Sequence, residues 1–290
     1  MSKLPTEIAA ALIEDINRTR VTSFRTADAA LAGESGASRI ILDQSGREHL
    51  LKWGAGDEFR LDDAIVITAE LVRRGYPIPA YLLTGSNLDL RWAIRPMFPG
   101  RTMDLLDRHH LARILDLNQT QAGAGASLSS DWPARIVESV LEGFQGWCVL
   151  DTFKTHSVET AAMLSQMQDY ARTAERSRFE SRDAVHFDFH TQNILVEDGD
   201  ITAVIDWEGC CAGDRAFDLA TLLFYSYELT ETRAPLWERL REIASAEVSA
   251  LYLSHMIVRQ LDWSIRRHGA AIVPRYFAIA REVLRDLRTS

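Results

Sequence analysis

The chain has 290 residues and a formal net charge of −9 at pH 7, which argues against nucleic acid or an anionic membrane as its main partner. A hydrophobic content of 47% and a charged content of 25% are typical of a soluble globular protein with one large domain or two lobes. No apolar run approaches the length of a membrane span, and the three cysteines imply neither a disulfide framework nor a zinc site. We therefore expect a cytoplasmic protein.

The N-terminal third is predicted to be rich in strands. Residues Thr6–Asn17 carry apolar residues at helical spacing and predict an amphipathic helix, and Val21–Leu31 is interpreted as a strand. The small-residue loop Gly33–Ser38 then leads into the apolar strand Ile40–Leu42. Such a loop allows backbone N–H groups to approach phosphates closely, although the same residues also mark an ordinary turn.

The strand Glu48–Trp53 carries a lysine among apolar residues. With a period of two, Lys52 shares one face with Leu50, while Leu51 and Trp53 share the other. A lysine in this position needs a route to solvent or an anionic partner. An edge-strand lysine that discourages aggregation would satisfy this pattern. The alternative, a nucleotide-binding lysine, is favoured by the order of loop, hairpin and lysine and by the family resemblance described below.

The next segments predict a helix, a strand and a boundary. Phe59–Arg74 has a helical pattern that Gly75 ends, and Leu88–Ile94 alternates as a strand does. Arg95–Gly100 breaks the alternation, and we interpret it as a hinge between lobes, the alternative being a proline-rich linker. The predicted lobes are residues 1–96 and 97–290.

The second part of the chain is predicted to be mostly helical. Asp131 is expected to cap the helix that begins at Trp132. Residues 121–130 are predicted to form a loop. Further helical patterns cover residues 103–117, 157–174, 216–225, 235–243, 247–267 and 274–287.

A hairpin is predicted inside this helical part. The apolar runs Ile194–Val196 and Ile201–Ile205 flank an Asp-Gly turn, which is a strong hairpin signal. Asp188, Asn193 and Asp206 are therefore expected at one end of a rigid ribbon. Carboxylate and amide oxygens so placed suit phosphoryl transfer, in which they orient a hydroxyl and hold magnesium.

A transition-metal site is the alternative chemistry for this segment. His186, Asp188, His190 and Asp206 could ligate a metal in a hydrolase, since histidine and carboxylate are suitable ligands. No further cluster of histidines follows in the sequence. Kinase chemistry is therefore the favoured interpretation.

The segment His186–Ala220 resembles the catalytic segment of the aminoglycoside phosphotransferase and choline kinase family. The resemblance rests on His186-x-Asp188, then Asn193, the hairpin, Asp206 and the stretch Gly213–Ala220. Members of this family are small-molecule kinases with a protein-kinase-like fold. The resemblance implies an α+β, bilobal chain with a small β-rich N-lobe and a larger helical C-lobe. ATP, with GTP as an alternative, and Mg²⁺ would be the cofactors.

The same resemblance implies a role for each candidate residue. Asp188 would be the catalytic base, and Asn193 and Asp206 would be the magnesium ligands. Asp218 would cap the backbone of the catalytic loop, and His186 would order it. Ser38 with its loop, Lys52, and the hinge with Arg95 and Met97 would bind the nucleotide, the hinge at the adenine edge.

Two further expectations concern partners. Kinase-like folds fix the strand lysine with an acid, and the spacing points to Asp62 or Asp63. The substrate is expected to be a small molecule with a hydroxyl group. The net charge of the protein permits a cationic substrate but does not require one. Among the substrates of the family, we favour an antibiotic of aminoglycoside or cationic peptide type. Five residues are candidate contacts for such a substrate, and the alternative for each is an ordinary solvated charge or core aromatic residue of a helix. They are Glu208, Glu228, Glu231, Asp262 and Trp263.

The sequence leaves other functions open. A metabolic kinase of choline, homoserine or sugar type shares the catalytic pattern, and a non-catalytic nucleotide-binding module shares the fold. The chain could act as a monomer or a homodimer.

Overall fold

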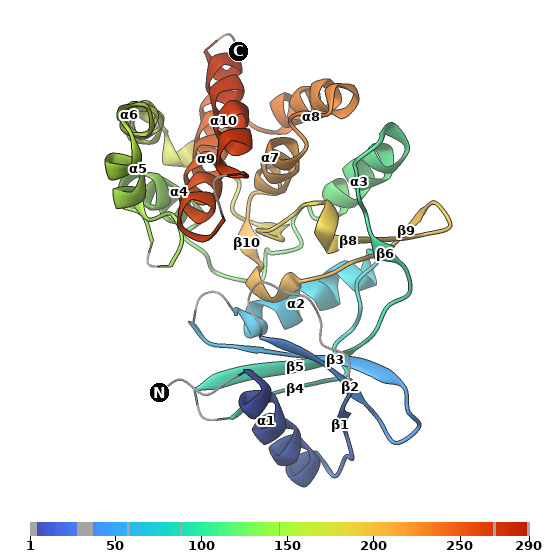
Figure 1. Cartoon of the computed structure of the whole chain (residues 1–290). Coiled ribbons are helices and arrows are strands. Elements are labelled where there is room, and N and C mark those ends of the chain that lie inside the picture. Colours follow the sequence, from blue (N-terminus) through green and yellow to red (C-terminus); the bar gives the residue numbers. More distant parts are fainter. Residues whose placement is uncertain are drawn as a thin grey trace. The chain divides into compact units, whose positions relative to one another are not determined.

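The computed structural model describes residues 5–27, 37–56, 59–87, 89–144, 146–268 and 271–288. The chain divides into two compact units (Figure 1). Unit 1 comprises Met1–Thr102 and Asn193–Cys210, and unit 2 comprises Met103–Gln192 and Cys211–Ser290. The chain therefore passes between the units three times, and the sequence-based division into lobes at residue 96 stays a prediction.

Unit 1 is built on a five-stranded antiparallel sheet in the order β1-β2-β3-β5-β4. Two helices, α1 (Pro5–Arg20) and α2 (Leu61–Arg73), cover its two faces (Figure 1). The strands are β1 (Arg25–Thr26), β2 (Ser38–Leu42), β3 (Glu48–Gly54), β4 (Leu83–Asn87) and β5 (Leu90–Pro96).

The two faces of this sheet carry different side chains because neighbours along a strand alternate. Leu51 and Trp53 of β3 are buried in the cluster that α1 covers, together with Trp92 of β5. Ala93 belongs to the cluster on the α2 side, and Lys52 is its register partner. The predicted faces of the lysine strand are thus confirmed, and Lys52 points away from α1.

A second, three-stranded sheet of unit 1 contains the predicted hairpin. β8 (Ile194–Glu197) pairs antiparallel with β9 (Asp200–Val204), and β6 (Arg101–Thr102) pairs with β8. Asp198 and Gly199 form the turn, with φ of 52° and 89°. Positive φ at both central residues is the conformation that the Asp-Gly sequence favours, so the hairpin prediction is confirmed.

Unit 2 is mainly helical. It contains one short antiparallel pair of strands, β7 (Asp183–Val185) with β10 (Cys211–Gly213). Its helices are α3 (Arg108–Thr120), α4 (Trp132–Leu141), α5 (Leu150–His156), α6 (Val158–Thr173), α7 (Ala216–Tyr225), α8 (Thr230–Ile243), α9 (Ala246–Arg267) and α10 (Val273–Leu287). No helix among the described residues is long and apolar enough to cross a membrane.

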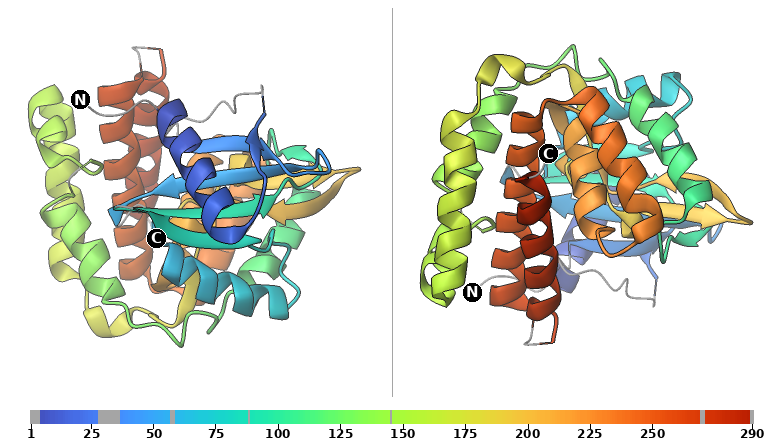
Figure 2. Two further views of the ribbon diagram at one scale, coloured as in Figure 1. Left: turned by 90° about the horizontal axis from the view of Figure 1, so that it is seen from below. Right: turned by 90° about the horizontal axis from the view of Figure 1, so that it is seen from above.

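Helix α9 is the centre of unit 2. It packs against α4, α5 and α6 on one side and against α7 and α8 on the other, with α10 alongside (Figure 2). Helix α7 is buried almost all round, with nine of its ten residues inaccessible, and one of these is Asp218. A carboxyl on such a helix needs hydrogen-bond donors.

Most predicted helices are confirmed, with shifted ends. The helix expected from Met103 begins at Arg108, because Asp107 caps it by accepting a hydrogen bond from His110 N. Asp131 caps α4 as predicted, by accepting from Ala134 N. The sequence missed α5 and the short strands β4, β6, β7 and β10.

Candidate active site

Lys52 is anchored to two carboxylates of unit 1. Its Nζ donates to the carboxylate of Asp206 and to Glu208 Oε2, the latter at 3.0 Å. Both acids follow the hairpin, at the start of the 3₁₀ turn Trp207–Gly209. The lysine side chain is 15% exposed, so its charge is compensated by these partners more than by water.

The expected partner of this lysine was wrong. Asp62 pairs with Arg91, and Asp63 pairs with Arg60 at 2.5 Å. Helix α2 thus uses its first-turn acids for surface arginines. The acid that the lysine needs comes from a segment about 150 residues further along the chain, a distance over which helical spacing carries no information.

Glu208 has several partners within unit 1. Besides Lys52 it faces Arg95 Nη1 at 3.6 Å and accepts a hydrogen bond from Tyr81 Oη at 3.3 Å. Its backbone carbonyl accepts from Arg60 N at 2.6 Å. Burial by itself would raise the pKa of Glu208, but Lys52 and Arg95 hold this pKa well below its usual range.

The pKa of Lys52 shows the reverse balance. Burial by itself would lower it, whereas the charges of Glu208 and Asp206 raise it above its usual value. The two directions agree, so acid and lysine are both charged at neutral pH. Glu208, considered from the sequence as a substrate contact, instead fixes the lysine.

Asn193 and Asp206 lie at the open end of the hairpin. Asn193 directly precedes β8, Asp206 follows β9, and Ile205 N donates to Asn193 O at 2.9 Å. Asp206 adopts a left-handed conformation with φ of 71°, and the fully buried ring of Trp207 follows it. Trp207 donates from Nε1 to Val204 O at 3.1 Å, which ties the turn to the hairpin.

The remaining predicted nucleotide residues also belong to unit 1. Ser38 begins β2 as the register partner of Lys52. Arg95 lies inside β5 and is 4% exposed, and its guanidinium pairs with the Glu208 carboxylate. Met97 follows β5, and its N–H donates to Glu48 O at 3.3 Å. The part of the predicted phosphate loop at residues 33–36 lies outside the described residues.

Asp188 belongs to unit 2, in the loop after β7. Asp218 of α7 holds this loop, because its carboxylate accepts hydrogen bonds from His186 N at 2.8 Å and Phe187 N at 3.0 Å. Gln121 Nε2 donates to the same carboxylate at 2.6 Å. The capping role that the family resemblance implied for Asp218 is therefore seen in the structure.

The Asp188 carboxylate contacts side chains from α9 and from its own loop. Arg259 Nη2 of α9 donates to Oδ1 at 2.7 Å, and His190 Nε2 lies 3.3 Å from Oδ2. His186 Nδ1 accepts from Asp188 N at 3.3 Å, as a loop-ordering residue would. Burial by itself would raise the pKa of Asp188, but Arg259 and His190 hold it far below its usual value.

Sequence reasoning missed Arg259. The available signal was a single arginine in the long apolar stretch of α9, where fifteen residues of the helix are buried. A cation in such a place needs an anionic partner. Its partner is 71 residues away in the sequence, so no spacing rule could name it.

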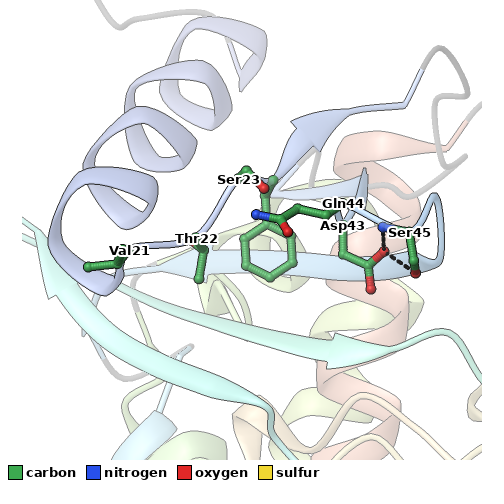
Figure 3. A pocket seen from close by; sticks show the side chains of 7 residues that line it. Val21, Thr22, Ser23, Asp43, Gln44 and Ser45 are labelled. Carbon is green, nitrogen blue, oxygen red and sulfur yellow. Dashed lines mark hydrogen bonds between the residues drawn. The ribbon is translucent and has the colours of Figure 1, made fainter.

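A hollow of about 330 Å³ in unit 1 does not involve these residues. It lies where α1 ends, beside the β2–β3 turn (Figure 3). Asp43 stabilises that turn by accepting from Ser45 N and Oγ at 2.8 and 2.7 Å. The residues around it are Val21, Thr22, Ser23, Phe24, Asp43, Gln44 and Ser45.

The strand lysine, the hairpin with its polar end and the capped aspartate loop define a protein-kinase-like α+β fold, as predicted. Residues 60–251 match the model of the phosphotransferase enzyme family, and the chain belongs to this family. That membership confirms the predicted resemblance. It also replaces the hydrolase interpretation, for which the described residues offer no metal-holding group of three or more His, Cys, Asp or Glu side chains.

One curated relative is the hygromycin-B 4-O-kinase of Escherichia coli, 35% identical over 114 residues. The match covers 38% of this chain and about a third (32%) of the relative's length.

Solved structures show the same fold at low identity. Aminoglycoside phosphotransferase APH(4)-Ia has a TM-score of 0.69 at 20% identity, with 97% of this chain and 98% of that chain covered. Choline kinase LicA from Streptococcus pneumoniae has a TM-score of 0.63 at 16% identity, covering 96% and 98%. A mutant of APH(4)-Ia was solved as a ternary complex with AMP-PNP and hygromycin B, at a TM-score of 0.67 and 20% identity, covering 95% and 98%.

Proposed function

We propose that the protein is an ATP-dependent kinase that transfers the γ-phosphate to a hydroxyl of a small molecule. The observation that carries this proposal is the anchoring of Lys52 by Asp206 and Glu208 beside Asn193. A lysine and a carboxylate so placed suit the phosphates of a nucleotide and the cation that accompanies them. The family and the nucleotide in the solved relative support the same reading.

In this proposal unit 1 binds the nucleotide. Lys52 contacts the α- and β-phosphates, and Ser38 with the loop before it lies along the triphosphate. The backbone from Arg95 to Met97 meets the base, while Glu208 keeps the lysine oriented. ATP is the proposed donor and GTP the alternative.

Asn193 and Asp206 would hold Mg²⁺. Their amide and carboxylate oxygens are the hard ligands that this ion prefers, and the Asp206 side chain is 46% exposed and thus accessible to a ligand. When bound, the ion supplies positive charge that neutralises the phosphates during transfer.

Asp188 is the proposed base. Asp188 is ionised at neutral pH, so it can accept a hydrogen bond from the attacking hydroxyl and orient it. Because Arg259 and His190 lower its pKa, it takes up the proton only as the phosphoryl group is transferred. Because little covalent chemistry is left to the protein, catalysis rests on positioning and on compensation of charge. The reaction is assigned to the cytoplasm, where ATP is available.

An antibiotic of the aminoglycoside type is the foremost proposed acceptor. The name of the curated relative supports it. Three of the carboxylates considered from the sequence, however, are already paired inside the protein: Glu208 with Lys52, Glu228 with Arg275, and Asp262 with Arg266. Contacts to a cationic acceptor would therefore come from other groups. Choline, homoserine or a sugar is the alternative acceptor, and the choline kinase among the similar structures supports keeping it.

The test is magnesium-dependent release of ADP from ATP or GTP with a panel of acceptors. The panel holds aminoglycosides including hygromycin B, cationic peptide antibiotics, choline, homoserine and simple sugars. We expect turnover with one class, and Asp188→Asn should lower it by several orders of magnitude while nucleotide binding stays nearly intact.

Asp198→Asn is the matched control, because Asp198 is an exposed turn residue and asparagine tolerates its positive φ. This variant should keep full activity. Turnover that survives Asp188→Asn would remove Asp188 from its role. Binding of nucleotide without turnover of any acceptor would favour a non-catalytic nucleotide-binding module.

A further inference from the structure

Arg259 is a largely buried cation on the central helix of unit 2. Its side chain is 20% exposed, and its neighbours Val258 and Gln260 are buried. The guanidinium lies 5.6 Å from the ring centre of Phe187 and 5.9 Å from that of Trp147. Contacts with two rings restrict the orientation of its plane.

The guanidinium makes two hydrogen bonds to consecutive residues of the catalytic loop. Nη2 donates to Asp188 Oδ1 at 2.7 Å, and Nη1 donates to Phe187 O at 2.8 Å. One planar group thereby fixes both the carboxylate and the peptide group that precedes it. Lysine could not reproduce this, because its ammonium is a point charge without the fixed fork of donors.

The backbone at this point is in a conformation that needs support. Phe187 has φ of 75°, in the left-handed region that non-glycine residues rarely adopt. Asp218 accepts its N–H and Arg259 donates to its C=O, so the residue is held from both ends. Loss of either contact would let the loop relax and carry Asp188 with it.

The charges around Asp188 come from several elements of unit 2. Arg259 is on α9, as is His255 one turn before it. His186 and His190 are on the loop itself, and Asp218 is on α7. On α4, Arg135 lies 4.7 Å from the ring centre of Phe187.

Resting on the proposed kinase function, we propose that Arg259 is the positioning residue of the catalytic base. It orients the Asp188 carboxylate toward the acceptor hydroxyl through its paired contacts with Oδ1 and with the Phe187 carbonyl. It touches neither substrate nor nucleotide in this role. The lowered pKa of Asp188 agrees with the same contact.

The kinetic experiment compares Arg259→Gln and Arg259→Lys with the wild type. Misplacement of a base by about an ångström costs on the order of 100-fold in rate, so Arg259→Gln should lower kcat by about that factor with KM for ATP unchanged. Arg259→Lys should recover only part of the loss. Arg267→Gln is the matched control, because Arg267 is an exposed arginine on the same helix.

Chemical rescue separates positioning from a general packing defect. Millimolar guanidinium chloride should restore part of kcat in Arg259→Ala, because the ion can refill the site next to Asp188. It should not restore Asp188→Asn. An Arg259→Gln enzyme with the kcat of Arg267→Gln, or with a loss in KM for ATP alone, would overturn the proposal.

A second measurement does not depend on turnover. Free energies of unfolding for Arg259→Gln, Asp188→Asn and the double variant form a cycle, and we expect clear non-additivity because the two side chains are in contact. Additive effects would overturn the ion pair whether or not the protein is a kinase. Absence of wild-type turnover with a non-additive cycle would refute the proposed function alone.

Discussion

At the scale of single residues, the most informative side chains are ions with defined partners inside the protein. Lys52 with Glu208 in unit 1 and Asp188 with Arg259 in unit 2 are each a charge that the fold compensates. Lys52 and Glu208 are both largely buried, so removing one would leave the other without compensation, which costs more than the pair contributes. The Asp188 side chain is 39% exposed, so its pair with Arg259 fixes an orientation more than it compensates a buried charge. These residues therefore constrain one another.

Asp218 predicts a pH dependence of stability. Burial raises its pKa to about 7, against three N–H donors that favour the carboxylate. The folded state thus holds a proton that the unfolded state has released between pH 4 and 7. The free energy of unfolding contributed by Asp218 should therefore fall as pH rises through that window, by at most about 1.4 kcal/mol per pH unit.

The measurement is urea unfolding at several pH values for the wild type and Asp218→Asn. The free energy of unfolding of the wild type minus that of Asp218→Asn should decline as pH rises to about 7 and then level off. Asp214→Asn is the comparison, since burial raises the pKa of Asp214 only to about 6 and its decline should end earlier. Subtraction also removes the opposing contribution of His255, whose pKa burial lowers. A flat difference would contradict the assignment to Asp218.

At the scale of elements, the strength of the local signal decided what the sequence could predict. The hairpin was recognisable because Asp198 and Gly199 suit a turn with two positive φ values. Strands of three residues, such as β7 and β10, are shorter than any usable period. These strands are stabilised by pairing with each other and by the packing of α4 against β10, and such contacts between distant segments cannot be predicted from a local pattern.

The same limit applies to the site. Asp188, Asn193 and Asp206 were identified from one continuous segment of sequence. Glu208 as the partner of Lys52, and Arg259 as the partner of Asp188, depend on contacts between distant segments. No periodicity reports such contacts.

Helix α1 gives the prediction at this scale. Leu12 is 3% exposed and belongs to the cluster that α1 shares with β3 and β5. Leu12→Ala should therefore cost about 2–5 kcal/mol of unfolding free energy, from lost burial and the cavity left behind. Glu14→Ala, on the exposed side of the same helix, should change stability by less than about 0.5 kcal/mol. Urea unfolding measures both, and equal effects would show that α1 does not dock as described.

At the scale of the whole molecule, the proposed roles divide between the two units. Lys52, Asn193 and Asp206 belong to unit 1, and Asp188 belongs to unit 2. Nucleotide binding and base function should therefore be separable by mutation, although both are needed for turnover.

Ligand-dependent stability tests that division. A nucleotide at 100 times its Kd stabilises a protein by about 2.7 kcal/mol. We expect AMP-PNP with Mg²⁺ to raise the Tm of the wild type and of Asp188→Asn similarly. Lys52→Met should lose most of the increase, measured against its own nucleotide-free Tm. An unchanged increase in Lys52→Met would show that the lysine does not bind the phosphates.

Residues 193–210 fold into unit 1 although they follow the first segment of unit 2 in the chain, and this has a consequence for biosynthesis. This segment supplies the Glu208 carbonyl to Arg60 N, Val204 N to Pro77 O, and the Trp207 ring to Tyr76. Residues 103–192 must be translated first, which at 5–20 residues per second takes about 5–20 s. The five-stranded sheet is complete before that interval, but Arg60, Tyr76 and Pro77 still lack their partners, so on the ribosome we expect chaperones to recognise the surface around these residues.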